Sequence, residues 1–491
     1  MNDYNKKLTM YKHTAFLKAI KDNNLNKIDE ILNDPKFDSS YVWNLDCVAD
    51  DGNEMFETYF TYACKIASNN TIEYIMNQNS LYKMIEYDSA SVIFACVKNN
   101  VNLLKKLMCD DRIDPAFDNN EAFIQACEHN SIDCINELLQ DDRIDITDQE
   151  NESLYTACFN NNLEVLLMLL NTNKFDTHCK YDCFKICCEN RHIDIIKKLL
   201  EDEEFDPSAN NNEMFIRACG NSEKEIVQLL LEHPNTNPAA NNNAAFILAC
   251  AYGHKEIVEL LLSKESVDPS DKNNLAIIKA CSNGYKQIVE LLLTHEKVDP
   301  SDQNNKAFIE ACKNSHYDIV CTLLEDHRVD PSDQNNLAFQ TICSTSYSSY
   351  SSSQLFEKLF HHERVDPAAN NNSAFIAACK HNNTKVVQLM MNDDRIDVCA
   401  QNNLAFTEAC KAQHLSIISL LLQSDLINPC VQNYKALHFA KNNKEMLKML
   451  LSDKRIFESF EQFQTIPSIH PSFVVKHRKL MNIILAERSS E

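Results

Sequence analysis

Thiol and imidazole side chains recur in this sequence with a spacing that suits chemistry. In four places a histidine follows a cysteine four positions later, which on a helix places the two side chains one turn apart. That geometry occurs in activated nucleophiles and in half of a metal site. The four pairs are Cys188/His192, Cys250/His254, Cys312/His316 and Cys410/His414. A catalytic pair is normally built once, whereas these pairs recur at a fixed place in a repeated phrase, so we interpret them as packing residues.

The densest group of possible metal ligands lies in the segment HCKYDCFKICC, at residues 178–188. It contains His178, Cys179, Cys183, Cys187 and Cys188, which is enough for a zinc site. However, the adjacent cysteines and the helical spacing do not match a Cys-x-x-Cys knuckle. The last three cysteines also stand where other copies of the phrase have Ala, Ala and Cys. We therefore predict close packing here and no metal.

Other signatures of catalysis or cofactor binding are absent from the sequence. It has no glycine-rich phosphate loop, no His-Glu-x-x-His and no Gly-x-Ser-x-Gly. Acidic pairs such as Asp110-Asp111, Asp141-Asp142 and Asp393-Asp394 recur at the ends of expected helices, where solvated turns explain them. We predict that the protein is not an enzyme, with no catalytic residue, no cofactor and no metal ion.

Length and charge narrow the class of protein. The chain has 491 residues, too many for one ordinary core, and its formal net charge of -24 disfavours an extended nucleic-acid surface. No apolar stretch approaches the roughly 18 residues of a membrane helix. The N-terminus MNDYNKKLTMYKH lacks the apolar core of a secretory signal. We expect a soluble cytoplasmic protein that binds no nucleic acid and inserts into no membrane.

One phrase, A-F-I-x-A-C, returns at a regular interval. In the centre of the chain its last residue falls at Cys219, Cys250, Cys281 and Cys312, which are 31 residues apart. Equivalent positions run from Ile20 to Lys441 and give about 14 units. A period of this length is typical of a solenoid, in which each unit contacts only its neighbours.

Each unit contains the pattern of two short helices. Phe246 and Cys250 belong to a first helix with small residues for close approach, and 257–262 carries the apolar stripe of a second. Asp268-Pro269 follows, and proline both stops a helix and favours an extended predecessor. The sequence therefore predicts an all-α array of helix-turn-helix units joined by short turns.

Asparagine replaces glycine in the expected turns. The chain has only 4 glycines, and asparagine is the non-glycine residue that best tolerates left-handed backbone and can also cap a helix. Pairs occur at Asn273-Asn274, Asn304-Asn305, Asn335-Asn336 and Asn402-Asn403. Between the helices, the slot of Gly253 and Gly284 is filled elsewhere by Asn99, Asn130, Asn161 and Asn382.

These features together resemble the ankyrin-repeat family. The unit AAFILACAYGHKEIVELLL (244–262) follows the family pattern T-P-L-H-x-A-A-x-x-G-H-x-E-I-V-x-L-L-L, and ALHFA (436–440) keeps its Leu-His pair. The Thr-Pro opening is mostly lost, cysteine replaces the second alanine, and the period is 31 rather than about 33. The asparagine- and cysteine-rich variety is similar to ankyrin proteins of large DNA viruses of amoebae and of some protists, and would then act in the host cytoplasm if viral.

The repeat is interrupted twice and ends before the C-terminus. We expect a capping repeat at 1–37, an insertion loop at 38–58, the array at 59–451 and a separate segment at 452–491. A Ser/Tyr-rich insertion at 344–354 is either a solvated loop or a phosphorylated or partner-binding one. The C-terminal segment either caps the last repeat or recruits a partner.

Positions that do not repeat are the candidates for recognition. The slot two residues before the repeated cysteine holds, among others, Lys18, Tyr62, Phe94, Gln125, Arg217, Leu248, Lys279, Glu310 and Glu408. The resemblance implies a concave surface formed by first helices and turn tips. On it we predict partner-binding roles for Arg217, Tyr252, Lys279, Glu310 and Lys313.

Two functions fit these expectations. The first is a monomeric scaffold that binds one or more intracellular proteins through the array. The second, implied by some viral members of the family, is an adapter that selects substrates for a ubiquitin ligase recruited through the C-terminal segment.

Overall fold

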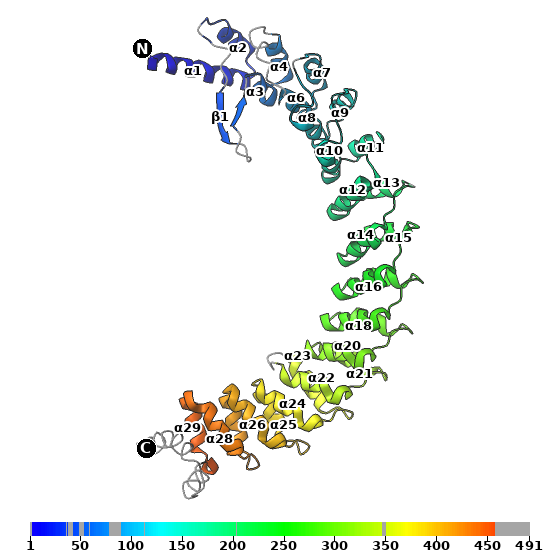
Figure 1. Cartoon of the computed structure of the whole chain (residues 1–491), viewed down its shortest axis with the longest axis vertical. Coiled ribbons are helices and arrows are strands. Elements are labelled where there is room, and N and C mark those ends of the chain that lie inside the picture. The colour runs from blue at the N-terminus through cyan, green and yellow to red at the C-terminus, as the bar shows by residue number, and fades with distance from the viewer. Residues whose placement is uncertain are drawn as a thin grey trace. The chain divides into compact units, whose positions relative to one another are not determined.

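The chain forms a succession of antiparallel helix pairs (Figure 1). The computed structural model describes residues 2–35, 37, 43–48, 54–57, 59–77, 90–111, 113–202, 204–345 and 350–456. Within these residues there are 14 helix pairs, which agrees with the number of units expected from the sequence. The all-α repeat architecture is confirmed, with one short β-hairpin added near the N-terminus.

The first helices of successive pairs pack beside one another over residues 2–190 and over residues 240–439. The first helices are α1 (Asn2–Lys21), α3 (Tyr59–Ile66), α6 (Ala90–Val97), α8 (Phe117–Glu128), α10 (Asp148–Phe159), α12 (Thr177–Asn190), α14 (Ala209–Gly220), α16 (Ala240–Tyr252), α18 (Asp271–Asn283), α20 (Asp302–Lys313), α22 (Asp333–Ser344), α24 (Ala369–Lys380), α26 (Ala400–Ala412) and α28 (Val431–Phe439).

The second helices, none of them longer than the first helix of its pair, form their own row. They are α2 (Leu25–Leu32), α4 (Asn69–Met76), α7 (Val101–Met108), α9 (Ile132–Leu138), α11 (Leu163–Leu170), α13 (Ile193–Leu200), α15 (Lys224–Glu232), α17 (Lys255–Leu262), α19 (Lys286–Leu293), α21 (Tyr317–Glu325), α23 (Tyr350–Phe360), α25 (Thr384–Met390), α27 (Leu415–Leu422) and α29 (Lys444–Ser452). A 3₁₀ turn, η2 (Ala440–Asn442), precedes the last of them.

The helix pairs divide into two compact units. Unit 1 comprises Met1–Ala218 with Glu225–Thr236, and unit 2 comprises Cys219–Lys224 with Asn237–Glu491. Unit 1 also contains the hairpin, in which β1 (Trp43–Val48) pairs antiparallel with β2 (Glu54–Glu57). The hairpin lies within 38–58, the range expected to be an insertion.

Each pair is held together by the repeated apolar residues. In α16, the side chains of Phe246 and Cys250 are fully buried. In α17, Val258 and Leu261 are buried as well, since they lie on the same face of that helix. Because neighbouring repeats fill the same slots, each compact unit has a core layer between its two rows of helices.

The turn that opens nine of the first helices in the described part of the chain has an unusual backbone. In α18, Lys272, Asn273 and Asn274 have φ values of 53°, 56° and 57°. Three successive residues thus adopt the left-handed conformation, which costs most side chains about 1–2 kcal/mol each and which asparagine tolerates best. The same triple occurs at Asp118–Asn120, Gln149–Asn151, Asn210–Asn212, Asn241–Asn243, Gln303–Asn305, Gln334–Asn336, Asn370–Asn372 and Gln401–Asn403.

The third residue of this turn joins one hairpin to the next. The side chain of Asn274 is buried. Its Nδ2 donates to Asp302 Oδ2 at 2.9 Å, and its Oδ1 accepts from the backbone N–H of Asp299 at 2.8 Å. The same two bonds recur from Asn120, Asn243 and Asn305. This buried amide therefore fixes both the left-handed turn and the register of neighbouring hairpins.

The turn between the two helices of a pair has the left-handed backbone that its asparagines predict. Asn99, Asn130, Asn161 and Asn382 have φ values of 48°, 53°, 59° and 61°, and Gly253 and Gly284 have 84° and 86°. Asparagine therefore takes the left-handed position where glycine is missing, as the sequence predicts.

The two departures from the repeat are only partly described. Of the Ser/Tyr insertion at 344–354, residues from Tyr350 onward are helical, and the hydroxyl of Ser352 donates to that of Ser315 at 3.2 Å. This part of the expected loop is therefore helix. Of the C-terminal segment at 452–491, residues 457–491 lie outside the described residues, so its role as a cap or as a recruiting segment stays a prediction.

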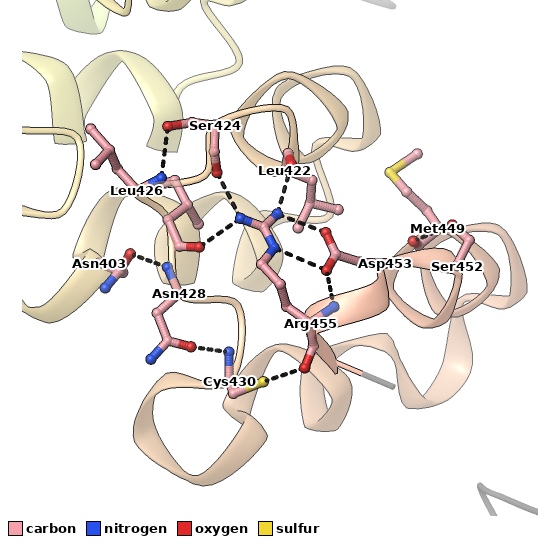
Figure 2. A network of polar contacts seen from close by, with 11 residues as sticks. Asn403, Leu422, Ser424, Leu426, Asn428, Cys430, Met449, Ser452, Asp453 and Arg455 are labelled. Atoms are coloured by element: carbon pink, nitrogen blue, oxygen red, sulfur yellow. Dashed lines mark hydrogen bonds and ion pairs between the residues drawn. The ribbon is translucent and has the colours of Figure 1, made fainter. Parts of the chain in front are cut away.

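An Asp-x-Arg pattern after some second helices ties each hairpin to the preceding one. Asp453 pairs with Arg455 at 2.7 Å. Figure 2 shows Arg455 also donating to the carbonyl groups of Leu422, Ser424 and Ile427, at 2.7, 2.7 and 2.9 Å. The same pairing recurs at Asp141/Arg143, Asp326/Arg328 and Asp393/Arg395. The packing of the array thus extends to Arg455, beyond the boundary at 451 expected from the sequence.

The buried side-chain amide of Asn274 should contribute more to the free energy of unfolding than the exposed side chain of Asn273. We expect Asn274→Ala to lower the free energy of unfolding by about 1–3 kcal/mol more than Asn273→Ala, because it leaves buried polar groups without a partner. Asn273 is the matched control, since it is exposed and has the same left-handed backbone. Equilibrium urea unfolding measures both. Equal losses of unfolding free energy in the two variants would mean that the left-handed backbone, and not the buried amide, determines the effect.

The Asp393–Arg395 pair predicts a pH dependence. Its hydrogen bond to Arg395 lowers the pKa of Asp393 to about 2. A carboxyl group whose pKa falls on folding stabilises the fold above its unfolded pKa of about 3.9, and that stabilisation is lost as the pH falls toward the folded value. We expect the loss of stability caused by Asp393→Asn to shrink by about half between pH 7 and pH 3. Asp394→Asn, at an exposed neighbour, is the control in thermal melts. A loss that is the same at both pH values would contradict the pairing.

Candidate functional site

The histidines of the recurrent Cys/His pairs bond to the main chain of the preceding hairpin. The Nε2 of His254 donates to the carbonyl of Gly220 at 2.8 Å, and the Nε2 of His316 donates to that of Ser282 at 3.1 Å. His192 and His414 make the same bond to the preceding hairpin, at 3.0 and 2.9 Å. Each imidazole thus bridges two hairpins through a main-chain acceptor.

The cysteines of these pairs are protected thiols. Burial raises the pKa of Cys250 and of Cys312 well above the ordinary value for a thiol. A thiol is nucleophilic as the thiolate, so these side chains are poor nucleophiles at neutral pH. Their role is that of a small buried hydrophobe.

The five residues of segment 178–188 that resemble a zinc site are not brought together. His178 is exposed, with Nδ1 3.9 Å from a carboxylate oxygen of Asp182. Cys183 and Cys187 are fully buried and form hydrogen-bonding contacts that, with burial, raise the pKa of Cys158. Across the described ranges, no group of three or more His, Cys, Asp or Glu side chains is placed to hold a metal ion.

The exposed residues of the first helices form a separate surface, which we call the first-helix face. In each repeat it consists of the side chains that lie six and two residues before the repeated cysteine and one or two residues after it. Neighbouring first helices within each unit lie side by side (Figure 1). This face therefore presents positions that vary from one repeat to the next.

Four of the five predicted partner-binding residues lie on successive first helices of unit 2. Tyr252 of α16 is 57% exposed, and Lys279 of α18 and Lys313 of α20 are exposed. Glu310 of α20 is half-buried and pairs with Lys313 at 3.6 Å. The fifth, Arg217, belongs to unit 1.

Arg217 is exposed but already paired. Its guanidinium lies 2.7 Å from the carboxylate of Glu189 on α12. At an exposed site such a pair contributes about 0–1 kcal/mol, so it can exchange for a partner's carboxylate at little cost. Arg217 is therefore available to a ligand only in competition with Glu189.

The charge of the first-helix face differs between α8 and α10 of unit 1, which are acidic, and α18 and α20 of unit 2, which carry lysines. In unit 1, Glu121, Glu128 and Glu152 lie on α8 and α10; burial, together with Asp118, Glu128 and Glu152, raises the pKa of Glu121, while a hydrogen bond from Gln125 lowers it. In unit 2, α18 and α20 carry Lys279, Lys306 and Lys313. The charge of the face is thus local to each unit.

Sequence reasoning missed some exposed members of this face. Lys306 is exposed and Leu275 is half-buried, both six residues before a repeated cysteine. Phe159, one residue after Cys158, is 64% exposed. The signal was available, because these slots also vary between repeats and lie one helical turn from the slot that was compared.

None of the helices within the described ranges has the length and apolar character required to cross a bilayer.

Comparison with known families identifies the repeat. The family model described as ankyrin repeats (3 copies) matches residues 92–180, 184–273, 264–335, 346–433 and 375–459. These segments cover most of the chain. No curated protein matches it.

The burial of the cysteines predicts their reactivity. We expect iodoacetamide at pH 8 to modify exposed Cys109 in the native protein, and to modify Cys250, Cys281 and Cys312 only after unfolding in urea. Mass spectrometry of digested peptides gives the modified fraction at each site. Rapid modification of Cys250 in the native protein would contradict a purely structural role.

Proposed function

Because the chain belongs to the ankyrin-repeat family, we propose that it is a non-enzymatic scaffold that binds intracellular protein partners through the first-helix face. Unit 2 supplies the part of that face on which we place binding, with Tyr252, Lys279, Glu310 and Lys313 as contact residues. Arg217 lies in unit 1, and we propose it as a contact residue of that unit's own part of the face.

The observation that carries this proposal is the contrast between two kinds of slot. The repeated residues, such as Phe246 and Cys250, are buried. The slot two residues before the cysteine is Leu248, Lys279 or Glu310 in successive repeats, and its side chain is half-buried or exposed. Packing does not require these differences, so a ligand is the better explanation of them. In interfaces, a few such exposed anchors carry most of the binding energy.

The absence of catalysis in this proposal is supported by the state of the reactive groups. The histidines of the Cys/His pairs donate to main-chain carbonyls, and burial raises the pKa of the paired cysteines. The repeated residues therefore have structural partners. We therefore place binding on the residues that vary between repeats.

We also propose that the protein works as a monomer in the cytoplasm, or in the host cytoplasm if the source is a virus. A buried row of thiols is compatible with a reducing compartment. The asparagine- and cysteine-rich composition supports a viral or protist source only through resemblance. The alternative of a ubiquitin-ligase adapter depends on 457–491, which lie outside the described residues, and no feature of the described part favours it.

A position-specific photocrosslink tests the proposal. The photoreactive amino acid p-benzoylphenylalanine is placed at position 279, on the first-helix face, or at position 286, at an exposed site on second helix α19, in the full chain. We expect covalent adducts with a protein partner from 279 and none from 286 in lysate of the source cells. Adducts only from 286, or equally from both positions, would contradict binding through the first helices.

Truncating the aromatic anchor should weaken capture of the same partner. We expect Tyr252→Ala to weaken binding roughly tenfold or more, since exposed aromatic side chains are frequent hot spots. Binding is measured by biolayer interferometry with the partner identified by crosslinking. Tyr11→Ala, which removes an exposed tyrosine from unit 1, is the matched control. An unchanged affinity for Tyr252→Ala would remove this residue from the site.

A further inference from the structure

A glycine in unit 2 leaves one side of an exposed tyrosine uncovered. Gly220 is one of only 4 glycines in the chain. A Cβ built on it would lie 3.7 Å from Cδ1 of Leu248 and 3.9 Å from Cδ2 of Tyr252. In other repeats the equivalent position, directly after the repeated cysteine, carries a side chain, as in Glu128 and Lys313. Any such side chain at 220 would cover Leu248 and the ring of Tyr252.

The backbone does not explain this glycine. The left-handed residue of the same turn is Ser222, with φ 65°, whereas only Gly253 and Gly284 have a positive φ among the glycines in the described ranges. Gly220 ends helix α14, where glycine is a poor helix former compared with alanine. What glycine provides here is open space beside Leu248 and Tyr252.

Positive charge lies next to this apolar surface. Lys279 on α18 and Lys306 on α20 are exposed. No ion pair is found for Lys279 in the described part of the chain, and Lys306 donates only to the amide oxygen of Gln303, at 3.3 Å. Of the carboxylates on α20, Glu310 pairs with Lys313, and Asp302 accepts from the amide of Asn274. Two lysines are therefore available to an incoming anion, in a chain whose formal net charge is -24.

The apolar and basic parts are one surface because their helices are neighbours. Helix α18 packs between α16 and α20 (Figure 1). Adjacent helices are about 8–10 Å apart, so two steps span about 20 Å. An extended peptide of about six residues covers that distance. We call the surface formed by Leu248, Tyr252, Lys279 and Lys306 the Tyr252 patch.

We propose that the Tyr252 patch binds an acidic peptide segment of a protein partner, in which an apolar side chain packs on Tyr252 and carboxylates pair with Lys279 and Lys306. This inference rests on the proposed function and specifies the chemistry of the partner. The uncovered side of Tyr252 selects the apolar side chain, and the lysines select acidic residues by charge complementarity.

A selection from random peptides tests the chemistry while the natural partner is still unidentified. A phage library of random 12-residue peptides is selected on the immobilised full chain at physiological salt. We expect the enriched peptides to contain an excess of Asp and Glu together with an aromatic or aliphatic residue. No enrichment, or enrichment without an acidic excess, would overturn the proposal.

Variants then locate the binding of an enriched peptide, measured by fluorescence anisotropy. We expect Lys279→Gln combined with Lys306→Gln to weaken binding at least tenfold, and raised salt to weaken it as well. The control replaces Lys255 and Lys286, which are exposed on second helices α17 and α19, and should change the dissociation constant by less than twofold. Equal effects of the two double variants would overturn the proposal.

The glycine supplies a second test. Gly220→Leu should weaken peptide binding several-fold by covering Tyr252, while Gly220→Ala, whose Cβ makes ordinary van der Waals contacts, should bind nearly as the natural chain does. Thermal melting shows that both variants fold. Equal affinities for the two variants would contradict the role of the open space.

Three further outcomes separate this inference from its alternatives. Tighter binding of a 12-nucleotide oligo-dT than of the enriched peptides would identify the patch as a nucleic-acid site and overturn the proposal. A photocrosslink from position 279 to a protein, with no acidic bias among selected peptides, would overturn this inference and leave the proposed function standing. Crosslinks from position 286 alone would overturn both.

Discussion

A buried asparagine amide, as at Asn120, Asn243, Asn274 and Asn305, joins one hairpin to the next and is the interaction on which this repeat structure depends. Asn274 closes a left-handed turn in its own repeat. Its side chain also bonds to two groups of the following repeat, the Asp302 carboxylate and the Asp299 N–H. A backbone of three left-handed residues is costly for most side chains, so the turn persists because this amide and its partners stabilise it. The 31-residue period follows, since each turn positions the next.

The contacts between hairpins and within the core give the histidines and cysteines structural roles. Histidines in the Cys/His pairs, such as His254, donate to a carbonyl of the preceding hairpin, and cysteines such as Cys250 fill the core. Both residue types recur because the interface between hairpins recurs. The variable residues of the first helices are under no such constraint, which is why binding is placed there.

Much of the fold can be predicted from the sequence, because the same packing positions recur in many repeats. The 14 units, the helix pairs and the left-handed asparagines were all predictable from period and composition. The buried bridge made by Asn274 was not, because the sequence does not show which of two adjacent asparagines turns inward. The extension of the array to Arg455 was missed because the Asp-x-Arg pattern occurs in only some repeats. On the proposed binding face, Lys279 was selected by comparing one slot, whereas the open side of Tyr252 depends on Gly220 in the preceding hairpin and needed the structure.

The central claim is that the first helices of unit 2 bind a partner while the second helices only support them. Hydrogen-exchange mass spectrometry of the full chain, with and without the crosslinked partner identified at position 279, tests it most directly. The account predicts slower exchange on binding in peptides from α16, α18 and α20 and no change in those from α17 and α19. Protection confined to the second helices, or to the turns at the start of the first helices, would contradict it.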